Sequence, residues 1–313
     1  MSIPANPQSI TKKQIIKGII YSNLFAVACF ALAYWIMNWN EGVGFVLSFS
    51  EFVLVPIAMG VIAMKFWITP NTRLLPLFPY ALINSIIAIA FSALFMGEGI
   101  ICILIVSPLV LAFMWIGVII GKHIMPRDKS TLKISTALVF VVLFAYDTFS
   151  EHNYRNVVTD EITINAPREV VWKYVAAHPL NTTEPGYWLF RVGLPNPIQS
   201  TVTADTVGAE RKCVFSNGAT FDEIIVESIR DSVFTFDIVK QPHDPEIIGH
   251  IEIRRGQFIL EDNVDGTTRL IGKSWYRLMV YPSWYYDLWA TDITREVHIR
   301  VMNHIKTLAE NDV

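Results

Sequence analysis

The chain has 313 residues, of which 52% are hydrophobic and 17% charged, and this length is enough for two domains. The charge is unevenly divided: residues 1–150 carry a net charge of +4 and the remainder −7, which together give the −3 of the whole chain. The acidic second half argues against nucleic acid as a partner, because binding to phosphates requires clustered cations.

Five apolar runs in the first half are long enough to span a membrane. A spanning helix needs about 20 mostly apolar residues, because roughly 30 Å of hydrocarbon is crossed at about 1.5 Å per residue. The predicted helices cover residues 18–37, 43–64, 77–96, 100–120 and 132–149. One such run could be a buried helix of a soluble protein, but five in series predict an all-α transmembrane bundle over residues 1–150.

The basic residues of the connecting segments predict how the bundle is oriented. They gather on alternate connections, in the order Lys12, Lys13, Lys17, then Lys65, Arg73, then Lys122, Arg127, Lys129, Lys133. By the positive-inside rule the N-terminus is cytoplasmic. With five spans the C-terminal half lies outside a bacterial inner (plasma) membrane, in the periplasm or extracellular space. One helix more or fewer would reverse this side.

Three residues of the bundle have a predicted local role. Pro56 and Pro108 are expected to kink their helices. Glu51 is an acid inside a span, which makes it a functional candidate by default. It also lies about two turns from the outer end of its span, so a packing or interfacial role is the simpler alternative.

From about residue 156 the pattern changes to short alternating runs that predict an α+β domain over residues 156–313. Residues 158–164 alternate like a strand, and a helix is expected to begin at Pro167. Asn217-Gly218 and Asp265-Gly266 mark two hairpins among about six antiparallel strands. A shift in apolar parity at Gly256 predicts a bulge.

A long final helix is predicted over residues 284–309, after Pro282-Ser283. Its apolar stripe at helical spacing consists of Tyr285, Trp289, Ile293, Val297, Val301, Ile305 and Leu308. A curved sheet around one amphipathic helix leaves space for a cavity between them.

Four motifs give this half a family resemblance. They are residues 164–172 (INAPREVVW), residues 211–218 (RKCVFSNG), residues 268–276 (TRLIGKSWY), and Trp289 followed by residues 298–301 (HIRV). In this order they resemble the START-like superfamily, also called SRPBCC, and in particular its bacterial polyketide cyclase/dehydrase-like members. The resemblance covers about residues 158–310. It implies a helix-grip fold with a pocket for an apolar or amphipathic small molecule, often a lipid or a polyketide-like ring system.

The expected pocket wall combines inward positions of the sheet with the final helix. The candidates are Phe215, Phe236, Tyr276, Trp289 and Ile293, with a filled core as the alternative for each. The resemblance implies that residues 184–191 lie near the pocket mouth. Trp188 could then cap a ligand and Arg191 could bind an anionic group; an Arg191 ion pair with Glu184 or Glu210 is the structural alternative.

Evidence for chemistry in the sequence is sparse. His298 could act as a general acid or base with Tyr276 as its partner, or could be a hydrogen-bonded core histidine. Cys213 is expected to be a small buried apolar residue, and no metal spacing or cofactor motif is present, so no metal and no cofactor are predicted. Asp292, Arg295, Glu296 and Arg300 are expected to form surface ion pairs.

Three functions remain open at this point. The first is membrane-anchored binding of a hydrophobic or amphipathic small molecule, with the lipid bilayer as the other partner. The second is an enzyme of cyclase or dehydratase type acting on such a ligand in the same cavity. The third is a purely structural partner for the bundle. The sequence does not determine the ligand or the oligomeric state.

Overall fold

The computed structural model describes residues 10–39, 50–69, 72–96, 99–125, 142–143, 146–147, 153–247 and 249–313. The chain divides into two compact units, Met1–His152 with Val280–Pro282 and Asn153–Met279 with Ser283–Val313.

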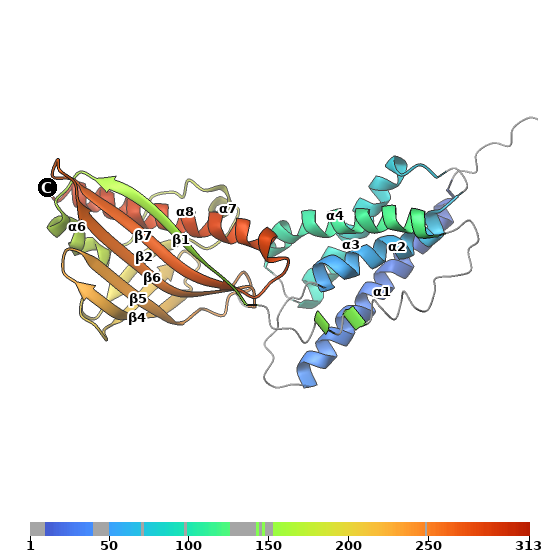
Figure 1. The fold of residues 1–313 in the computed structure, drawn as a ribbon, viewed down its shortest axis with the longest axis horizontal. Coiled ribbons are helices and arrows are strands. Elements are labelled where there is room, and N and C mark those ends of the chain that lie inside the picture. Colours follow the sequence, from blue (N-terminus) through green and yellow to red (C-terminus); the bar gives the residue numbers. More distant parts are fainter. Residues whose placement is uncertain are drawn as a thin grey trace, which may run out of the picture. The chain divides into compact units, whose positions relative to one another are not determined.

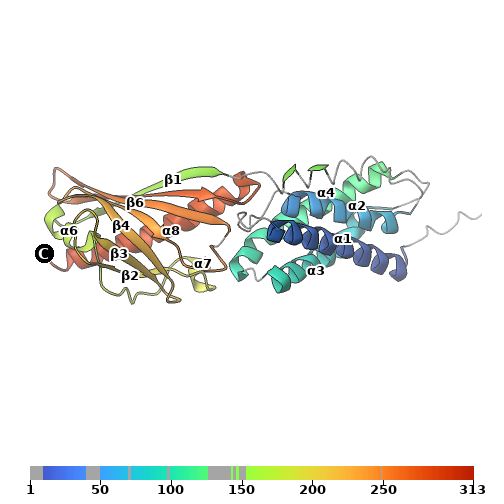
Figure 2. The ribbon, with the colours of Figure 1, turned by 90° about the horizontal axis from the view of Figure 1, so that it is seen from below.

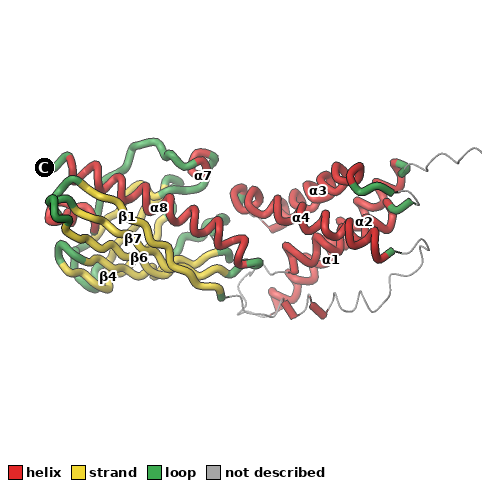
Figure 3. Tube along the Cα trace, turned by 45° about the horizontal axis from the view of Figure 1, so that its top comes forward, coloured by secondary structure: helices red, strands yellow, loops and turns green. Residues whose placement is uncertain are grey.

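The first unit is a helical bundle (Figures 1 and 3). Its elements are α1 (Lys12–Trp39), η1 (Ser50–Leu54), α2 (Val55–Trp67), η2 (Leu75–Leu77), α3 (Phe78–Met96) and α4 (Ile100–Ile124). Among the described residues, four helices are long and apolar enough to cross a membrane. The fifth predicted helix, residues 132–149, lies outside the described residues apart from 142–143 and 146–147.

The helices of the bundle approach closely at glycines. A Cβ on Gly60 would lie 2.2 Å from the Met114 carbonyl oxygen, and one on Gly117 would lie 2.1 Å from that of Ile57. The α2 and α4 backbones are therefore in direct contact, as small residues permit in membrane bundles. Asn84 of α3 adds a polar contact, because its Nδ2 donates to Ser22 Oγ of α1 at 3.0 Å.

The two bundle prolines differ in their effect. Pro56 follows a change from π-helix to α-helix at Leu54–Val55, where its missing N–H and ring disturb the regular hydrogen bonding. Pro108 lies inside α4, which continues through it as one helix. Glu51 is buried, which agrees with the packing role given as the simpler alternative.

The second unit is built on one antiparallel sheet (Figures 1 and 2). Its strands are β1 (Tyr154–Ile164), β2 (Pro197–Val202), β3 (Glu210–Phe215), β4 (Thr220–Ile229), β5 (Val233–Lys240), β6 (Ile251–Asp262) and β7 (Thr268–Leu278). They are ordered β1-β7-β6-β5-β4-β3-β2. The Asn-Gly and Asp-Gly hairpins are confirmed, with Gly218 and Gly266 at φ of 83° and 80°, a backbone region that glycine adopts without strain.

Three helices accompany the sheet: α6 (Arg168–Val175), α7 (Trp188–Arg191) and α8 (Ser283–Glu310). Pro167 is the N-cap of α6, so the helix begins at Arg168, one position after the predicted start. The 28-residue α8 runs along the sheet (Figure 2). A curved antiparallel sheet that holds one long C-terminal helix is the helix-grip fold, so the predicted fold class is confirmed.

Two local predictions need correction. The bulge lies between Ile253 and Arg255 rather than at Gly256. The buried face of α8 consists of Ala290, Thr294, His298, Val301, Met302, Ile305 and Ala309, so its N-terminal half is rotated by about one residue from the predicted apolar stripe. Thr294 is polar and was not expected to be buried, whereas a buried, hydrogen-bonded His298 was one of the two alternatives.

Candidate functional site

One end of the concave face is a closed core. Phe234, Phe258, Leu260 and Leu270 pack there against side chains of α6 and of the C-terminal half of α8, such as Trp172, Met302 and Ile305. The ring of Trp172 meets that of Phe234 edge to face at 6.0 Å. This end therefore stabilises the fold.

The other end of the same face stays in contact with solvent. Side chains alternate between the two faces of a strand, so Phe215, Ile238 and Ser274 share the inward face of the buried Arg211, Phe236 and Tyr276. All three are nevertheless partly exposed. Strand register places Ile238 opposite Glu223 of β4, and it places Ser274 opposite Gly256 of β6, which in turn lies opposite Phe236.

The N-terminal half of α8 meets this open end. Thr291 and Arg295 contact the β1–β7 side, through Tyr276 and Asp160. On the opposite side Asp292 accepts a hydrogen bond from Tyr187 at 2.6 Å. With about 3.6 residues per turn, Ile293 and Val297 lie on the flank between the face that meets the sheet and the face that meets residues 183–197. Both are partly exposed, as is Trp289.

Tyr276 packs in a small apolar cluster with Val158, Leu278 and Ala290, and its hydroxyl is held in a polar network. Its side chain is 1% exposed, and its hydroxyl donates to Asp287 Oδ1 at 2.6 Å and lies 3.0 Å from Thr291 Oγ1. Asn156 donates to the same carboxylate at 2.9 Å. Burial, followed by the Asp287 hydrogen bond, raises the pKa of Tyr276, so the phenol stays protonated and fixes the start of α8 to β7.

His298 is hydrogen-bonded at both ring nitrogens. Its Nδ1 lies 2.9 Å from Asp160 Oδ2 on β1, and its Nε2 lies 2.7 Å from Ser274 Oγ on β7. Arg295 Nε donates to the second carboxylate oxygen of Asp160 at 2.9 Å. Burial lowers the pKa of His298 despite the hydrogen bond and charge of Asp160. The partner expected for His298 was Tyr276, whereas the structure provides Ser274 and Asp160.

A buried ion pair between Arg211 and Glu223 lies beside the ring of Phe236. Arg211 of β3 and Glu223 of β4 have side chains that are only 3% and 5% exposed. Arg211 Nε donates to the Ala176 carbonyl at 2.8 Å, and its guanidinium lies 4.4 Å from the centre of the Phe236 ring. Burial raises the pKa of Glu223 more than Arg211 lowers it. The pKa of the Cys213 thiol is raised to about 12, by burial and by Glu223, so it is a poor nucleophile at neutral pH.

The predicted mouth residues lie on α7. Trp188 is 45% exposed, while its neighbours Leu189 and Phe190 are buried. Arg191 Nε donates to the Pro185 carbonyl at 3.0 Å, in place of the suggested pairing with Glu184 or Glu210. Leu189 and Phe190, rather than Trp188, therefore pack into the domain interior.

The four charged residues of α8 that were expected to pair, Asp292, Arg295, Glu296 and Arg300, form no ion pair with one another, whereas Lys306 and Glu310 do, at 3.7 Å. Arg295 binds Asp160. Arg300 donates to the carbonyls of Thr183 at 2.9 Å and Pro197 at 3.2 Å. These contacts attach α8 to β1 on one side and to residues 183–197 on the other, so this face is not simply solvated.

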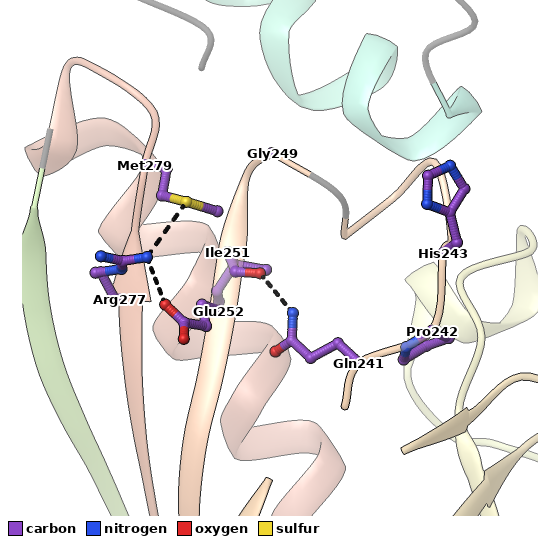
Figure 4. A pocket seen from close by; sticks show the side chains of 8 residues that line it. All are labelled: Gln241, Pro242, His243, Gly249, Ile251, Glu252, Arg277 and Met279. Carbon is purple, nitrogen blue, oxygen red and sulfur yellow. Dashed lines mark hydrogen bonds and ion pairs between the residues drawn. The ribbon is translucent and has the colours of Figure 1, made fainter. Parts of the chain in front are cut away.

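A separate crevice of about 240 Å³ lies at the end of β6 and β7 (Figure 4). Arg277 and Glu252 form an ion pair there at 2.7 Å, and Arg277 also approaches Met279 Sδ at 3.9 Å. Because Ile253 and Tyr276 point inward, their neighbours Glu252 and Arg277 lie on the outward face. The side of the crevice formed by Glu252 and Arg277 is thus on the outer face of the sheet.

Sequence reasoning missed the partners of the site. Asp160, Ser274, Arg211 and Glu223 stand in ordinary alternating strands, and only strand pairing brings each to its partner. The sequence signal that could have identified them is a polar residue on a strand face where the residues two positions before and after it are apolar. Within the described ranges no cluster of three or more His, Cys, Asp or Glu could hold a metal ion.

No family model and no curated protein matches the chain. Solved structures align with its C-terminal half. A protein from Nitrosospira multiformis is 15% identical and covers 49% of this chain and 94% of its own, with a TM-score of 0.34. Truncated norcoclaurine synthase from Thalictrum flavum is 11% identical, with coverages of 51% and 96% and a TM-score of 0.35. A Thermobifida fusca protein is 18% identical, with coverages of 50% and 93% and a TM-score of 0.32. Such values say nothing about function.

Proposed function

We propose that this chain is an integral membrane protein whose helix-grip domain binds a hydrophobic or amphipathic small molecule. The observation that carries the proposal is the contrast along the concave face. One end is a closed core, whereas apolar side chains at the other end, such as Phe215 on the sheet and Ile293 on α8, remain partly exposed. Removing apolar side chains from contact with water lowers the free energy, and this favours binding of an apolar ligand over them.

The composition of the open end supports an apolar ligand with a polar group. Its walls are apolar or aromatic, from Phe215 and Ile238 on the sheet and Trp289 and Ile293 on α8, with Phe236 beneath. Its polar groups are few and fixed, among them Ser274. Ligand sites usually combine an apolar lining with a small number of placed polar groups. Covering about 300 Å² of apolar surface contributes roughly 7.5 kcal/mol before the costs of association.

The bundle gives this binding a location. A domain attached to four helices that are long enough to cross a bilayer stays near the phase in which apolar molecules concentrate. The distribution of basic residues supports a cytoplasmic N-terminus in a bacterial plasma membrane. The membrane domain comprises residues 1–150 and the binding domain residues 156–313. With a fifth span over residues 132–149, the binding domain would lie on the outer side of the membrane. Trp188 and Arg191 would lie at the mouth.

A blocking variant tests the proposal. Full-length protein in nanodiscs is titrated with a fluorescent fatty-acid analogue whose emission rises in apolar surroundings. Ile293→Trp fills the open end and is expected to weaken binding at least tenfold. The matched control is Leu288→Trp, the same kind of change at a position of α8 that is 65% exposed. Equal binding by both variants, or saturable binding by neither variant nor wild type, would contradict the proposal.

A further inference from the structure

Three residues from three separate elements form a continuous hydrogen-bonded chain. Asp160 on β1 contacts His298 Nδ1 at 2.9 Å, and His298 Nε2 contacts Ser274 Oγ on β7 at 2.7 Å. An ionised carboxylate only accepts hydrogen bonds, so Nδ1 carries the proton and donates to Asp160. Nε2 then bears the lone pair and accepts the Ser274 hydroxyl proton. This is the direction in which histidine acts as a base toward serine.

The surrounding residues hold this arrangement in place. Arg295 binds the other oxygen of Asp160 at 2.9 Å, which fixes the carboxylate between two partners. Gly272 lies two positions before Ser274 on the same face; a Cβ there would lie 3.1 Å from Met302 Sδ and 3.7 Å from His298 Cγ. Glycine therefore lets α8 and its imidazole approach β7 closely.

The members differ in exposure in the way a reactive serine requires. His298 is 5% exposed and is covered by the sheet, while Ser274 is partly exposed. Ser274 lies opposite Gly256 of β6, and the Phe236 ring occupies the space where a Gly256 Cβ would be. The Ser274 hydroxyl is thus close to the Phe236 ring of the proposed binding site. His298 is more deeply buried than Ser274.

We propose that Ser274, His298 and Asp160 are a catalytic serine, its general base and a positioning carboxylate that hydrolyse an ester or thioester of the apolar ligand. This inference rests on the proposed function, because the open end would supply the substrate. Ser274 Oγ attacks the acyl carbon and its proton passes to His298 Nε2. The bond to the leaving alcohol or thiol breaks, and the leaving group takes that proton. Water then cleaves acyl-Ser274 by the same route, releasing the acid.

Two features support this assignment over a purely structural hydrogen bond. A residue that only packs against α8 could be apolar and would need no hydrogen-bond partners, whereas a buried polar group costs free energy unless it is hydrogen-bonded. In addition, the lowered pKa of His298, caused chiefly by burial, keeps the imidazole neutral at pH 7, the form that can accept a proton.

A fluorophosphonate probe with an alkyl chain tests the nucleophile directly. Its phosphorus forms a bond to a reactive serine Oγ and fluoride leaves. Full-length protein in detergent is expected to be labelled, with the adduct on the peptide that contains Ser274. Ser274→Ala should abolish labelling, and His298→Gln should slow it at least 100-fold. Ser228→Ala is the control, because Ser228 Oγ donates to the Asp205 carbonyl rather than to a histidine; it should label like wild type.

A pH profile separates positioning from structure. The charged groups around His298 are Asp160 on β1 and Arg295 on α8, with Glu296 near both. The labelling rate should rise with pH through a midpoint below 6.5. Asp160→Asn removes a charge that raises the pKa of His298, so the midpoint should move lower and the maximal rate should fall 10- to 1,000-fold. An unmoved midpoint with a normal rate would contradict the role of Asp160.

The outcomes distinguish this inference from the proposed function. No labelling of Ser274, in protein that still binds the fluorescent fatty acid, would overturn the triad and leave the binding proposal standing. Labelling at Ser274 in protein that does not bind the fatty acid would support the triad and contradict the proposed ligand class.

Discussion

Arg211 and Glu223 are charged side chains with almost no exposure, and they face the apolar interior of the domain. Each has been removed from water at a cost that its partner offsets. Arg211 also places its guanidinium against the Phe236 ring at 4.4 Å, a favourable cation–π position. The pair therefore fixes the β3–β4 part of the concave wall in one geometry.

Removing one partner of this ion pair is expected to destabilise the domain more than removing both partners. Arg211→Met leaves a buried carboxylate alone and should lower the free energy of unfolding by about 3–5 kcal/mol. The double variant Arg211→Met/Glu223→Leu removes both charges and should lose less than the single variant does. Urea unfolding of the purified protein measures the free energy of unfolding of both variants. A loss in the double variant as large as that in Arg211→Met would contradict this account.

His178 gives the fold a pH dependence. It is 4% exposed, its Nε2 has no hydrogen-bond partner within the described residues, and burial lowers its pKa from 6.5 to about 4. Between these values the unfolded state binds more protons than the folded state, so stability falls as pH falls. From pH 6.5 to about 4 the loss from this group alone is roughly 3 kcal/mol.

The variant His178→Gln isolates this effect. Unfolding free energies of wild type and variant, measured from pH 7.5 to 4, should converge as the pH falls, because only wild type loses the contribution of the neutral imidazole. The difference between the two curves removes the titration of the carboxylates, which both proteins share. Parallel curves would show that His178 does not carry this dependence.

At the scale of elements, local patterns were sufficient for the strands and hairpins but not for the faces of α8. The turn residues Asn217-Gly218 and Asp265-Gly266 act locally, so their hairpins could be predicted. The burial of Thr294 and the partners of His298 could not, since Asp160 and Ser274, which hydrogen-bond to His298, are distant from it in sequence. An apolarity count favours Ile293 and Val297 over these polar residues.

The β6 bulge shows the same limit. The parity shift was visible in sequence, but the register shift falls between Ile253 and Arg255. Gly256 is required for a different reason: a Cβ there would lie 2.4 Å from the Phe236 ring of the neighbouring strand. The pocket candidates Phe215, Trp289 and Ile293 were chosen from periodicity and fall at the open end, whereas Tyr276 belongs to a polar network.

Backbone contact between α2 and α4 yields a prediction for the bundle. Gly117→Val introduces a branched side chain whose Cβ would lie 2.1 Å from the Ile57 carbonyl oxygen, so the helices must separate. The expected loss is about 1–3 kcal/mol of stability, seen as a lower unfolding temperature in detergent. Ile116→Val, at an adjacent position that is 41% exposed, is the control and should unfold like wild type.

At the scale of the whole molecule, the side of the membrane on which the binding domain lies depends on the number of spans. Four helices are described, and a fifth is expected from residues 132–149. Five spans place the N-terminus and the C-terminal domain on opposite sides, and four place them on the same side. The source of the ligand, inside or outside the cell, follows from this count.

Cysteine labelling determines the side. In a background with Cys29, Cys102 and Cys213 replaced by serine, Val264→Cys provides an exposed site in the β6–β7 turn, and Lys122→Cys a site at the end of α4. A membrane-impermeant maleimide should label Val264→Cys in intact spheroplasts and Lys122→Cys only after permeabilisation. Equal labelling of both sites in intact spheroplasts, or the reverse pattern, would contradict the five-span topology.

The central claim is that the open end of the concave face holds an apolar or amphipathic molecule, and native mass spectrometry of the full-length protein tests it most directly. Protein extracted from membranes in mild detergent should carry a bound small molecule of defined mass. Occupancy should fall in Trp289→Ala and Ile293→Trp and persist in Leu288→Trp. A homogeneous unliganded mass in wild type, unchanged after incubation with a total lipid extract, would contradict the claim.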